Sequence, residues 1–265
     1  MKIDRAKAHL RDLEGQIKAF HGRKPYSVFV DQNSEPGKVH FRIKVSECVP
    51  AHWSAIIGDI IHNLRSSLDL LATALVAANG GSTKHTYFPF AKNPADFEPK
   101  VLRERMKGAS PKAITFAKRL KPYPGGNEAL WKLHALDLLD KHQAIIPVGA
   151  AHTGLNPDFA HVIPPIDTLS PKIRDMDETM RRFLKERPIF LNVRGSKGWF
   201  PMQDNTILLT LPAPKAGQPK PNPQFTFEIA FGEGQIIDGE PVVETLQSFI
   251  KLAERIAKIA QRHFF

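Results

Sequence analysis

The sequence predicts an α+β protein: a helical first half that includes a β-hairpin, a mainly antiparallel sheet in the second half, and a C-terminal helix that closes the fold. Several long segments repeat apolar residues every three or four positions, and several short runs alternate apolar with polar residues. The chain has 265 residues, 42% of them hydrophobic and 24% charged, which suffices for a buried core. We expect one domain over 1–265, with a division into a mostly helical part (1–150) and a sheet with the last helix (151–265) as the alternative.

The helices are predicted from their apolar spacing and their ends. Residues 2–20 carry one narrow apolar stripe. Pro50 opens a helix of about 28 residues, which ends near the glycines at 79–81, where a left-handed cap is available. A further helix covers 127–142, and Pro241 starts an amphipathic helix that runs to the end of the sequence.

The strands are predicted from alternation. The runs 26–31 and 38–45 flank a polar turn and indicate a β-hairpin. In the second half we expect a helix over 171–185 and further strands, at 144–149, 188–194, 206–211 and 224–231. The proline-rich segment Pro212–Pro223 is typical of an irregular loop that faces solvent.

The sequence offers no sign of a membrane span, a signal peptide or a disulfide. The most apolar segment, 56–78, is interrupted by Asp59, His62, Arg65 and Asp69. The first residues are charged and amphipathic, and the single cysteine cannot form an intrachain disulfide or a cysteine-based zinc cluster. We therefore predict a soluble cytoplasmic protein with no membrane partner and no cofactor.

The chain is basic, and its cations are densest in one segment. It carries 37 lysines and arginines against 27 acidic residues, a net charge of +10. Such a balance allows binding to the phosphates of a nucleic acid. The segment 94–121 is polar and helical, with Pro111 as a break, and we predict sequence-independent contacts to RNA or DNA from its basic residues, Lys100, Arg103, Arg105, Lys107, Lys112, Lys118 and Arg119.

Two of the predicted helices place charged residues where they need partners. In the helix from Pro50, one side is apolar and the other carries Asp59, His62, Arg65 and Asp69. The helix 127–142 has apolar residues almost all the way round its axis, yet His134, Asp137 and Lys141 fall along one line. Burying charge is expensive unless the charge is paired. We therefore predict that these two polar faces meet and form a polar seam.

Three kinds of site are compatible with this seam. Carboxylates and histidines on one helical face can bind a divalent metal, but Arg65 and Lys141 would repel it, so we expect no metal. A phosphodiesterase-like site would use His62 or His134 as acid–base, Arg65 and Lys141 as phosphate stabilisers, and Asp69 and Asp137 to orient them. The third alternative is a purely structural ion-pair network that holds two helices in register.

Two strings in these helices carry a resemblance to a known family. They are Gly58-Asp-Ile-Ile-His-Asn-Leu-Arg-Ser-Ser-Leu-Asp69 and Leu130-Trp-Lys-Leu-His-Ala-Leu-Asp-Leu-Leu-Asp-Lys-His142. Both resemble signature stretches of a bacterial and phage family of uncharacterised proteins, and the similarity extends over most of the chain. The resemblance implies a shared fold and no particular chemistry.

A more remote similarity is to the HEPN superfamily, whose helical ribonucleases use an arginine and a histidine separated by four to six intervening residues. Arg65 would be that arginine, but positions 70–72 hold Leu70, Leu71 and Ala72. The family's catalytic pair is therefore incomplete, and His62, one turn earlier on the same face, is the candidate substitute. The resemblance implies a helical fold and an RNA partner.

Taken together, the sequence predicts a nucleic-acid-binding protein with ribonuclease-like chemistry at the seam. The alternative is a non-catalytic interaction or scaffolding protein whose seam is structural. Its amphipathic N-terminal or C-terminal helix would then serve as the surface of a homodimer. Whether the protein is an enzyme is left open by the sequence.

Overall fold

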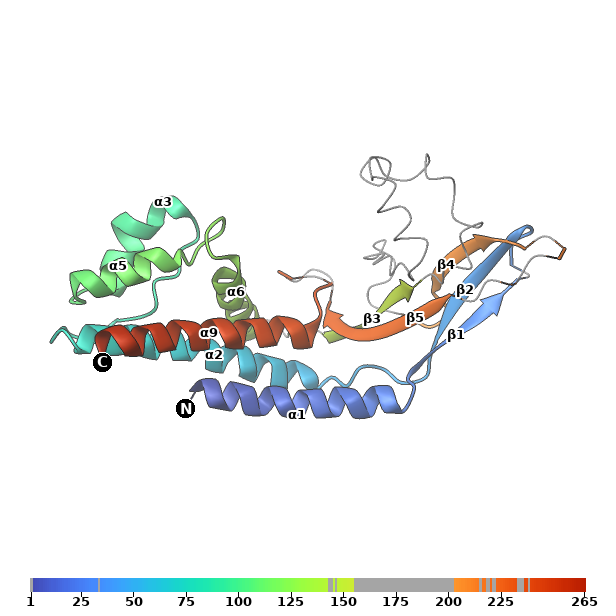
Figure 1. Ribbon diagram of the computed structural model, residues 1–265, viewed down its shortest axis with the longest axis horizontal. Helices are drawn as coiled ribbons and strands as arrows, with labels where there is room; N and C mark the ends of the chain where they lie inside the picture. Colours follow the sequence, from blue (N-terminus) through green and yellow to red (C-terminus); the bar gives the residue numbers. More distant parts are fainter. Residues whose placement is uncertain are drawn as a thin grey trace, which may run out of the picture. The chain divides into compact units, whose positions relative to one another are not determined.

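The computed structural model confirms the α+β class (Figure 1). It describes residues 2–32, 34–142, 145, 147–154, 203–214, 216–217, 220, 223–232, 236–237 and 239–265. The helical elements are α1 (Lys2–Gly22), α2 (Trp53–Ala77), α3 (Pro94–Asp96), the π-helix η1 (Phe97–Leu102), α4 (Arg103–Arg105), α5 (Pro111–Leu120), α6 (Glu128–His142) and α9 (Val242–Phe264). The strands are β1 (Tyr26–Asp31), β2 (Lys38–Val45), β3 (Pro147–Gly154), β4 (Ile207–Pro212) and β5 (Gln224–Phe231).

The chain forms two compact units, and neither is a continuous half of the sequence. The helical unit contains residues 1–19, 50–147 and 234–265. The sheet unit contains residues 20–49 and 148–233. Both polar faces of the predicted seam and the basic segment belong to the helical unit.

Helix α2 is the centre of the helical unit. It packs against α6 and α9, and its buried residues include Ile57, Ile61, Leu64 and Leu68. Helix α1 joins this core through polar contacts as well: Gln16 Oε1 accepts from the Trp53 indole at 2.8 Å. The apolar faces of α1 and α9 are buried within the unit. The predicted homodimer through one of these helices stays a prediction. The apolar faces of α1 and α9 are not free to form it, because they are buried within the single chain.

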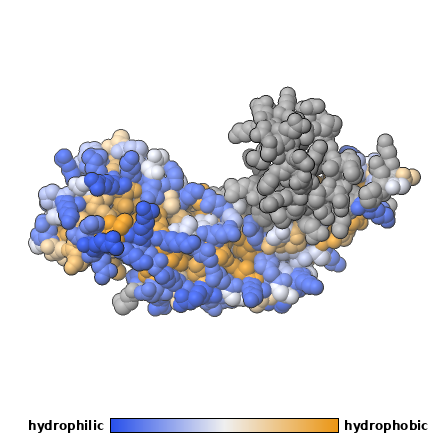
Figure 2. All heavy atoms as spheres, in the orientation of Figure 1, coloured by the Kyte–Doolittle hydropathy of each residue, from blue (hydrophilic) through white to orange (hydrophobic). Residues whose placement is uncertain are grey.

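The basic segment is not one helix. It is divided into α3, η1, α4 and α5, because Ser110 caps α5 and Pro111 occupies its first turn. The Ser110 hydroxyl accepts from the Ala113 N–H at 3.2 Å, and Lys121 ends the helix in the left-handed conformation. On the face shown in Figure 2, apolar side chains gather between α5 and α9. They belong to a small second core that includes Phe97, Leu102 and Met106.

The sheet unit pairs the predicted hairpin with a strand from the second half of the chain. Strands β1 and β2 are antiparallel with Tyr26 opposite Val45, and β4 adds to the other edge of β2, again antiparallel. Strands β3 and β5 form a second, two-stranded sheet. The Phe41 and Phe225 rings meet at 6.1 Å between centroids, so the two sheets share an aromatic core.

Several sequence predictions can be compared with these elements. The hairpin strands and the strand 224–231 coincide with β1, β2 and β5. The predicted helix 171–185 and the strand 188–194 lie outside the described residues, as does part of the loop 212–223. Helix α6 is less enclosed than its composition suggests, since the Leu138 side chain is 44% exposed. Among the residues that the structure describes, no helix has both the length and the apolar composition needed to cross a bilayer.

Candidate functional site

Helices α2 and α6 bring the two predicted polar faces together. His62 and Arg65 of α2 contact Asp137 and His134 of α6, respectively. The predicted seam therefore exists, but its six residues separate into an inner part and an outer edge. Arg65, Asp69 and His134 are partly buried and form the inner part, whereas His62 and Lys141 form the outer edge with the buried Asp137 between them.

The inner part is centred on the Arg65 guanidinium. Arg65 Nη1 lies 2.5 Å from Asp69 Oδ1, one turn along α2, in an ion pair that lacks the angles of a hydrogen bond. Arg65 Nε donates to His134 Nδ1 at 3.2 Å, and its Cζ lies 4.4 Å from the centre of the Phe90 ring. Asp69 also accepts from the Phe88 N–H at 2.8 Å. The ion pair, the hydrogen bonds and the ring contact replace part of the water around these groups, while Arg65 Nη1 has the ion pair with Asp69 and no hydrogen bond.

His134 is a hydrogen-bond acceptor in this arrangement. Its ring stacks on the Phe90 ring, with centroids 4.4 Å apart and planes 15° apart. Burial, followed by the positive charge of Arg65, lowers the pKa of His134 from 6.5 to about 4, against the opposing effect of the Asp137 and Asp69 carboxylates. The imidazole is therefore neutral at pH 7, with Nδ1 free to accept from Arg65.

The outer edge is built on one buried carboxylate. The Asp137 side chain is 3% exposed, whereas those of His62 and Lys141 are 51% and 49% exposed. Lys141 Nζ donates to Asp137 Oδ2 at 2.6 Å, and His62 Nδ1 lies 3.3 Å from Oδ1. A carboxylate at Nδ1 fixes the proton on that nitrogen and leaves Nε2 as a proton acceptor. The arrangement presents an oriented imidazole and an ammonium group to solvent.

Ser66 extends this line of groups. Its hydroxyl lies 3.3 Å from His62 Nε2, so hydroxyl, imidazole and carboxylate follow one another in the order of an acyl-transfer triad. Ser66 lies in the interior of α2, where the backbone N–H groups are used within the helix. The oxyanion site that acyl transfer needs therefore cannot be built from the backbone next to this serine. The contact shows instead that a hydroxyl fits within reach of Nε2.

A second carboxylate of α6 lies against the α2 backbone. A side-chain carbon at Gly58 would meet the Asp140 carboxylate, so a larger residue at this position would have to displace that side chain. Burial, and then the neighbouring Asp137 and Asp59 carboxylates, raise the pKa of Asp140. Among the described residues, no group of three or more His, Cys, Asp or Glu side chains is arranged to hold a metal ion.

The seven basic residues predicted to bind nucleic acid are all exposed in the helical unit. Three of them make side-chain contacts: Lys118 pairs with Glu98 at 2.7 Å, Arg105 lies over the Tyr87 ring, and Lys112 Nζ donates to the His263 carbonyl at 3.1 Å. The Lys112 contact joins α5 to the C-terminal end of α9. The remaining four, Lys100, Arg103, Lys107 and Arg119, form no ion pair with another described residue.

Sequence reasoning missed Phe90, Ser66 and Asp140 as members of the site. Phe90 lies in a segment without regular structure, and its only sequence signal is the aromatic cluster at 87–90 between two helices. Ser66 and Asp140 stand on the expected helical faces, and the periodicity alone could have included them.

The comparisons with known proteins leave the site to be interpreted from its geometry. No protein-family model matches the chain, and searches of curated proteins and of solved structures returned no match. The resemblances to the bacterial and phage family and to the HEPN superfamily stay predictions, carried by the residues quoted for them.

The buried Asp137 carboxylate makes its lysine partner important for stability. Lys141→Met leaves that carboxylate with His62 as its remaining partner, and we expect a loss of about 1–3 kcal/mol in the free energy of unfolding. Adding Asp137→Asn to Lys141→Met should recover part of this loss, because a neutral amide needs no cation. Urea unfolding at pH 7 measures the free energy of unfolding of the single and of the double variant.

The control for this pair is Lys132→Met on the same helix. Lys132 pairs with Glu240, whose side chain is partly exposed, so water can replace the lysine and the loss should stay below about 1 kcal/mol. A Lys141→Met variant as stable as the wild type, or a double variant less stable than Lys141→Met alone, would contradict the assignment of a buried, cation-dependent carboxylate.

The lowered pKa of His134 predicts a pH dependence of stability. In the unfolded chain the imidazole titrates near 6.5, whereas in the native protein it stays neutral until about pH 4. The unfolded state therefore binds more protons between these values, and stability falls as the pH falls from about 6.5 to about 4. From pH 7 to pH 5 this residue should remove about 2 kcal/mol, and His134→Gln should abolish that part of the loss. An equal pH dependence of stability in the wild type and in the His134→Gln variant would refute the lowered pKa of His134.

Proposed function

We propose that this chain binds nucleic acid and cleaves RNA at the outer edge of the seam. The observation that carries the proposal is a half-exposed imidazole, His62, oriented by a buried carboxylate and set beside an exposed ammonium group. An imidazole whose Nδ1 is held by a carboxylate can act as a general base through its other nitrogen.

The basic segment supplies the binding step. Its seven cations are exposed on the same compact unit as His62, so an RNA strand bound through its phosphates would be held on the unit that carries the imidazole. Contacts of this kind position the strand without reading its sequence. Binding of this kind weakens as the salt concentration rises.

The chemical step uses the 2′-hydroxyl of RNA as the nucleophile. His62 Nε2 takes the proton of the 2′-hydroxyl, and the 2′ oxygen attacks the adjacent phosphorus. The bond from phosphorus to the 5′ oxygen breaks, and that oxygen takes a proton from water. The products are a 2′,3′-cyclic phosphate and a 5′-hydroxyl end, after which the imidazolium returns its proton to solvent. Lys141 stabilises the charge that develops on the phosphate oxygens.

The inner part of the seam supports this edge and takes no part in the reaction. Arg65 is occupied by Asp69, His134 and Phe90, and His134 is neutral at pH 7 and partly buried. Their role is to hold α2 and α6 in the register that sets His62 against Asp137. Of the groups first considered, Lys141 therefore keeps the role of phosphate stabiliser and His62 that of acid–base, whereas Arg65 and His134 keep only a structural role.

A second candidate function follows from the same burial. If the entire seam serves only to hold the two helices together, the protein is a non-catalytic interaction or scaffolding protein. The contacts of Arg65 with His134 and the stacking of His134 on Phe90 favour this reading for the inner part of the seam. The two candidates differ in what happens to RNA.

The test is a paired binding and cleavage assay on a single-stranded RNA and a DNA of the same sequence. We expect both to bind and RNA alone to be cut, because DNA lacks the 2′-hydroxyl. His62→Ala should reduce the cleavage rate by about 10²–10⁴-fold and leave binding nearly unchanged, because it removes the base and no backbone contact.

His85→Asn serves as the matched control. His85 is exposed in the same unit and has a positive φ of 63°, a conformation that asparagine tolerates. Its cleavage rate should equal that of the wild type. Cleavage that persists in His62→Ala refutes the catalytic assignment, and the absence of RNA binding at low salt leaves the scaffolding candidate.

A further inference from the structure

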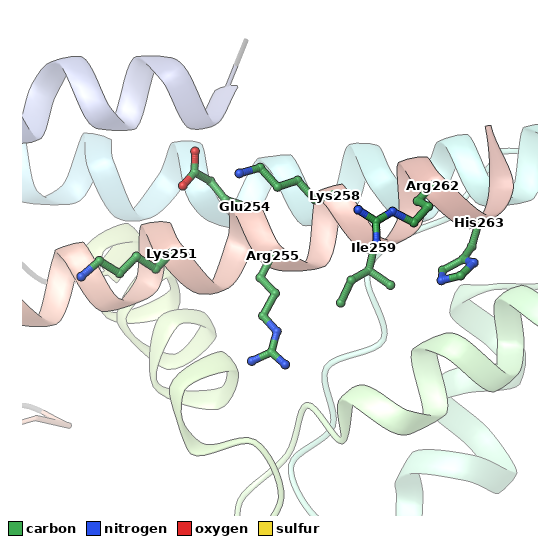
Figure 3. A pocket seen from close by; sticks show the side chains of 7 residues that line it. All are labelled: Lys251, Glu254, Arg255, Lys258, Ile259, Arg262 and His263. Atoms are coloured by element: carbon green, nitrogen blue, oxygen red, sulfur yellow. The ribbon is translucent and has the colours of Figure 1, made fainter.

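The exposed side of α9 forms a basic hollow that the seam does not use. The hollow has a volume of about 380 Å³, and its lining comes entirely from this helix: Lys251, Glu254, Arg255, Lys258, Ile259, Arg262 and His263 (Figure 3). Four of the seven residues are permanent cations. The acidic member, Glu254, is paired with Lys7 of α1.

The four cations are available for an external partner. We call Lys251, Arg255, Lys258 and Arg262 the α9 cation row. All four are exposed, and no described residue forms a hydrogen bond or an ion pair with their side chains. Their spacings of four, three and four residues place them along one face over about 16 Å of helix. A row of like charges without counter-charges in the described structure favours a polyanionic partner with regularly spaced charges.

The opposite side of α9 argues against a membrane as that partner. Leu246, Phe249, Ala253 and Ile256 are buried against the rest of the helical unit. A helix that binds a bilayer inserts its apolar face between the lipids, and here that face is already part of the core. The cation row is therefore left with electrostatic contacts, which fit a phosphate backbone.

Aromatic groups stand at one end of the row. His263 lines the hollow, and the residue Phe265 is 66% exposed. Single-stranded nucleic acids are bound by cations that follow the backbone and by aromatic rings on which the bases stack. The Lys112–His263 contact also connects this end of the row to the basic segment on α5.

We propose that the α9 cation row is a binding track for the phosphate backbone of single-stranded nucleic acid, with Phe265 as a stacking platform for a base. This inference rests on the proposed function and names the surface that holds the strand. The α9 cation row is a second binding surface, on a different helix from the seven residues of the basic segment.

The experiment measures binding of a fluorescent single-stranded RNA across a salt series. The variant changes all four cations of the row to glutamine: K251Q, R255Q, K258Q and R262Q. Each lost phosphate contact on a single strand should reduce the magnitude of the slope of log K against log salt by about 0.7. The slope measured for the variant should therefore be smaller in magnitude by about 3 than that of the wild type. The side chains have no partner in the described structure, and circular dichroism should show an unchanged fold.

The matched control removes the same charge elsewhere on the helical unit. Arg5, Lys18, Lys84 and Lys92 are exposed and lie outside the row and the basic segment. Their change to glutamine should lower the slope by less than about 1. A further variant, F265A, should weaken binding of single-stranded RNA and leave binding of duplex RNA unchanged.

The outcomes separate this inference from the proposed function. If the wild type fails to bind RNA at low salt, both fail. If the wild type binds and the row variant keeps its slope, or if both quartets lower the slope equally, the track is refuted while nucleic-acid binding stands. Binding to vesicles with anionic lipid in place of RNA would likewise overturn the track.

Discussion

The helical unit depends on how Arg65 is neutralised between α2 and α6. A guanidinium in an apolar interface is tolerated only where ion pairing, hydrogen bonding and ring contacts replace its water. Here Asp69 supplies the counter-charge, His134 accepts a hydrogen bond, and the Phe90 ring covers the planar face. Because these three partners come from different segments, satisfying Arg65 fixes the register of α2 against α6 and the path of the segment that carries Phe90.

That register decides which polar residues remain accessible. With Arg65 and His134 in contact between the helices, the next positions along the two helices, His62 and Asp137, meet at the edge of the interface. Asp137 is buried and anchors both His62 and Lys141, which are half exposed. The contacts of Arg65 thus give the inner part of the seam a structural role, and they leave an oriented imidazole and an ammonium group at its edge.

The sequence was most informative where periodicity and burial act together. The hairpin strands and the meeting of the two polar faces could be predicted, because charges at helical spacing on a buried face require partners. The pairing of β2 with β4 could not, since a strand far along the chain carries no local signal of its neighbour. Phe90 was missed for a similar reason: it acts through a loop, where no periodicity reports on which ring will cover Arg65. The α9 cation row was visible as a polar face, but its lack of counter-charges appears only in the folded unit.

We propose that the seam has a structural interior and an edge that a ligand can reach. Nuclear magnetic resonance of the histidine side chains tests this division directly, with His62 and His134 assigned from single variants and a single-stranded DNA added stepwise, since DNA lacks the 2′-hydroxyl and stays intact. The His62 signals should shift with binding while those of His134 keep their positions. A His62 signal that stays unchanged at saturation, or a His134 signal that moves as far as that of His62, would contradict this division of the seam.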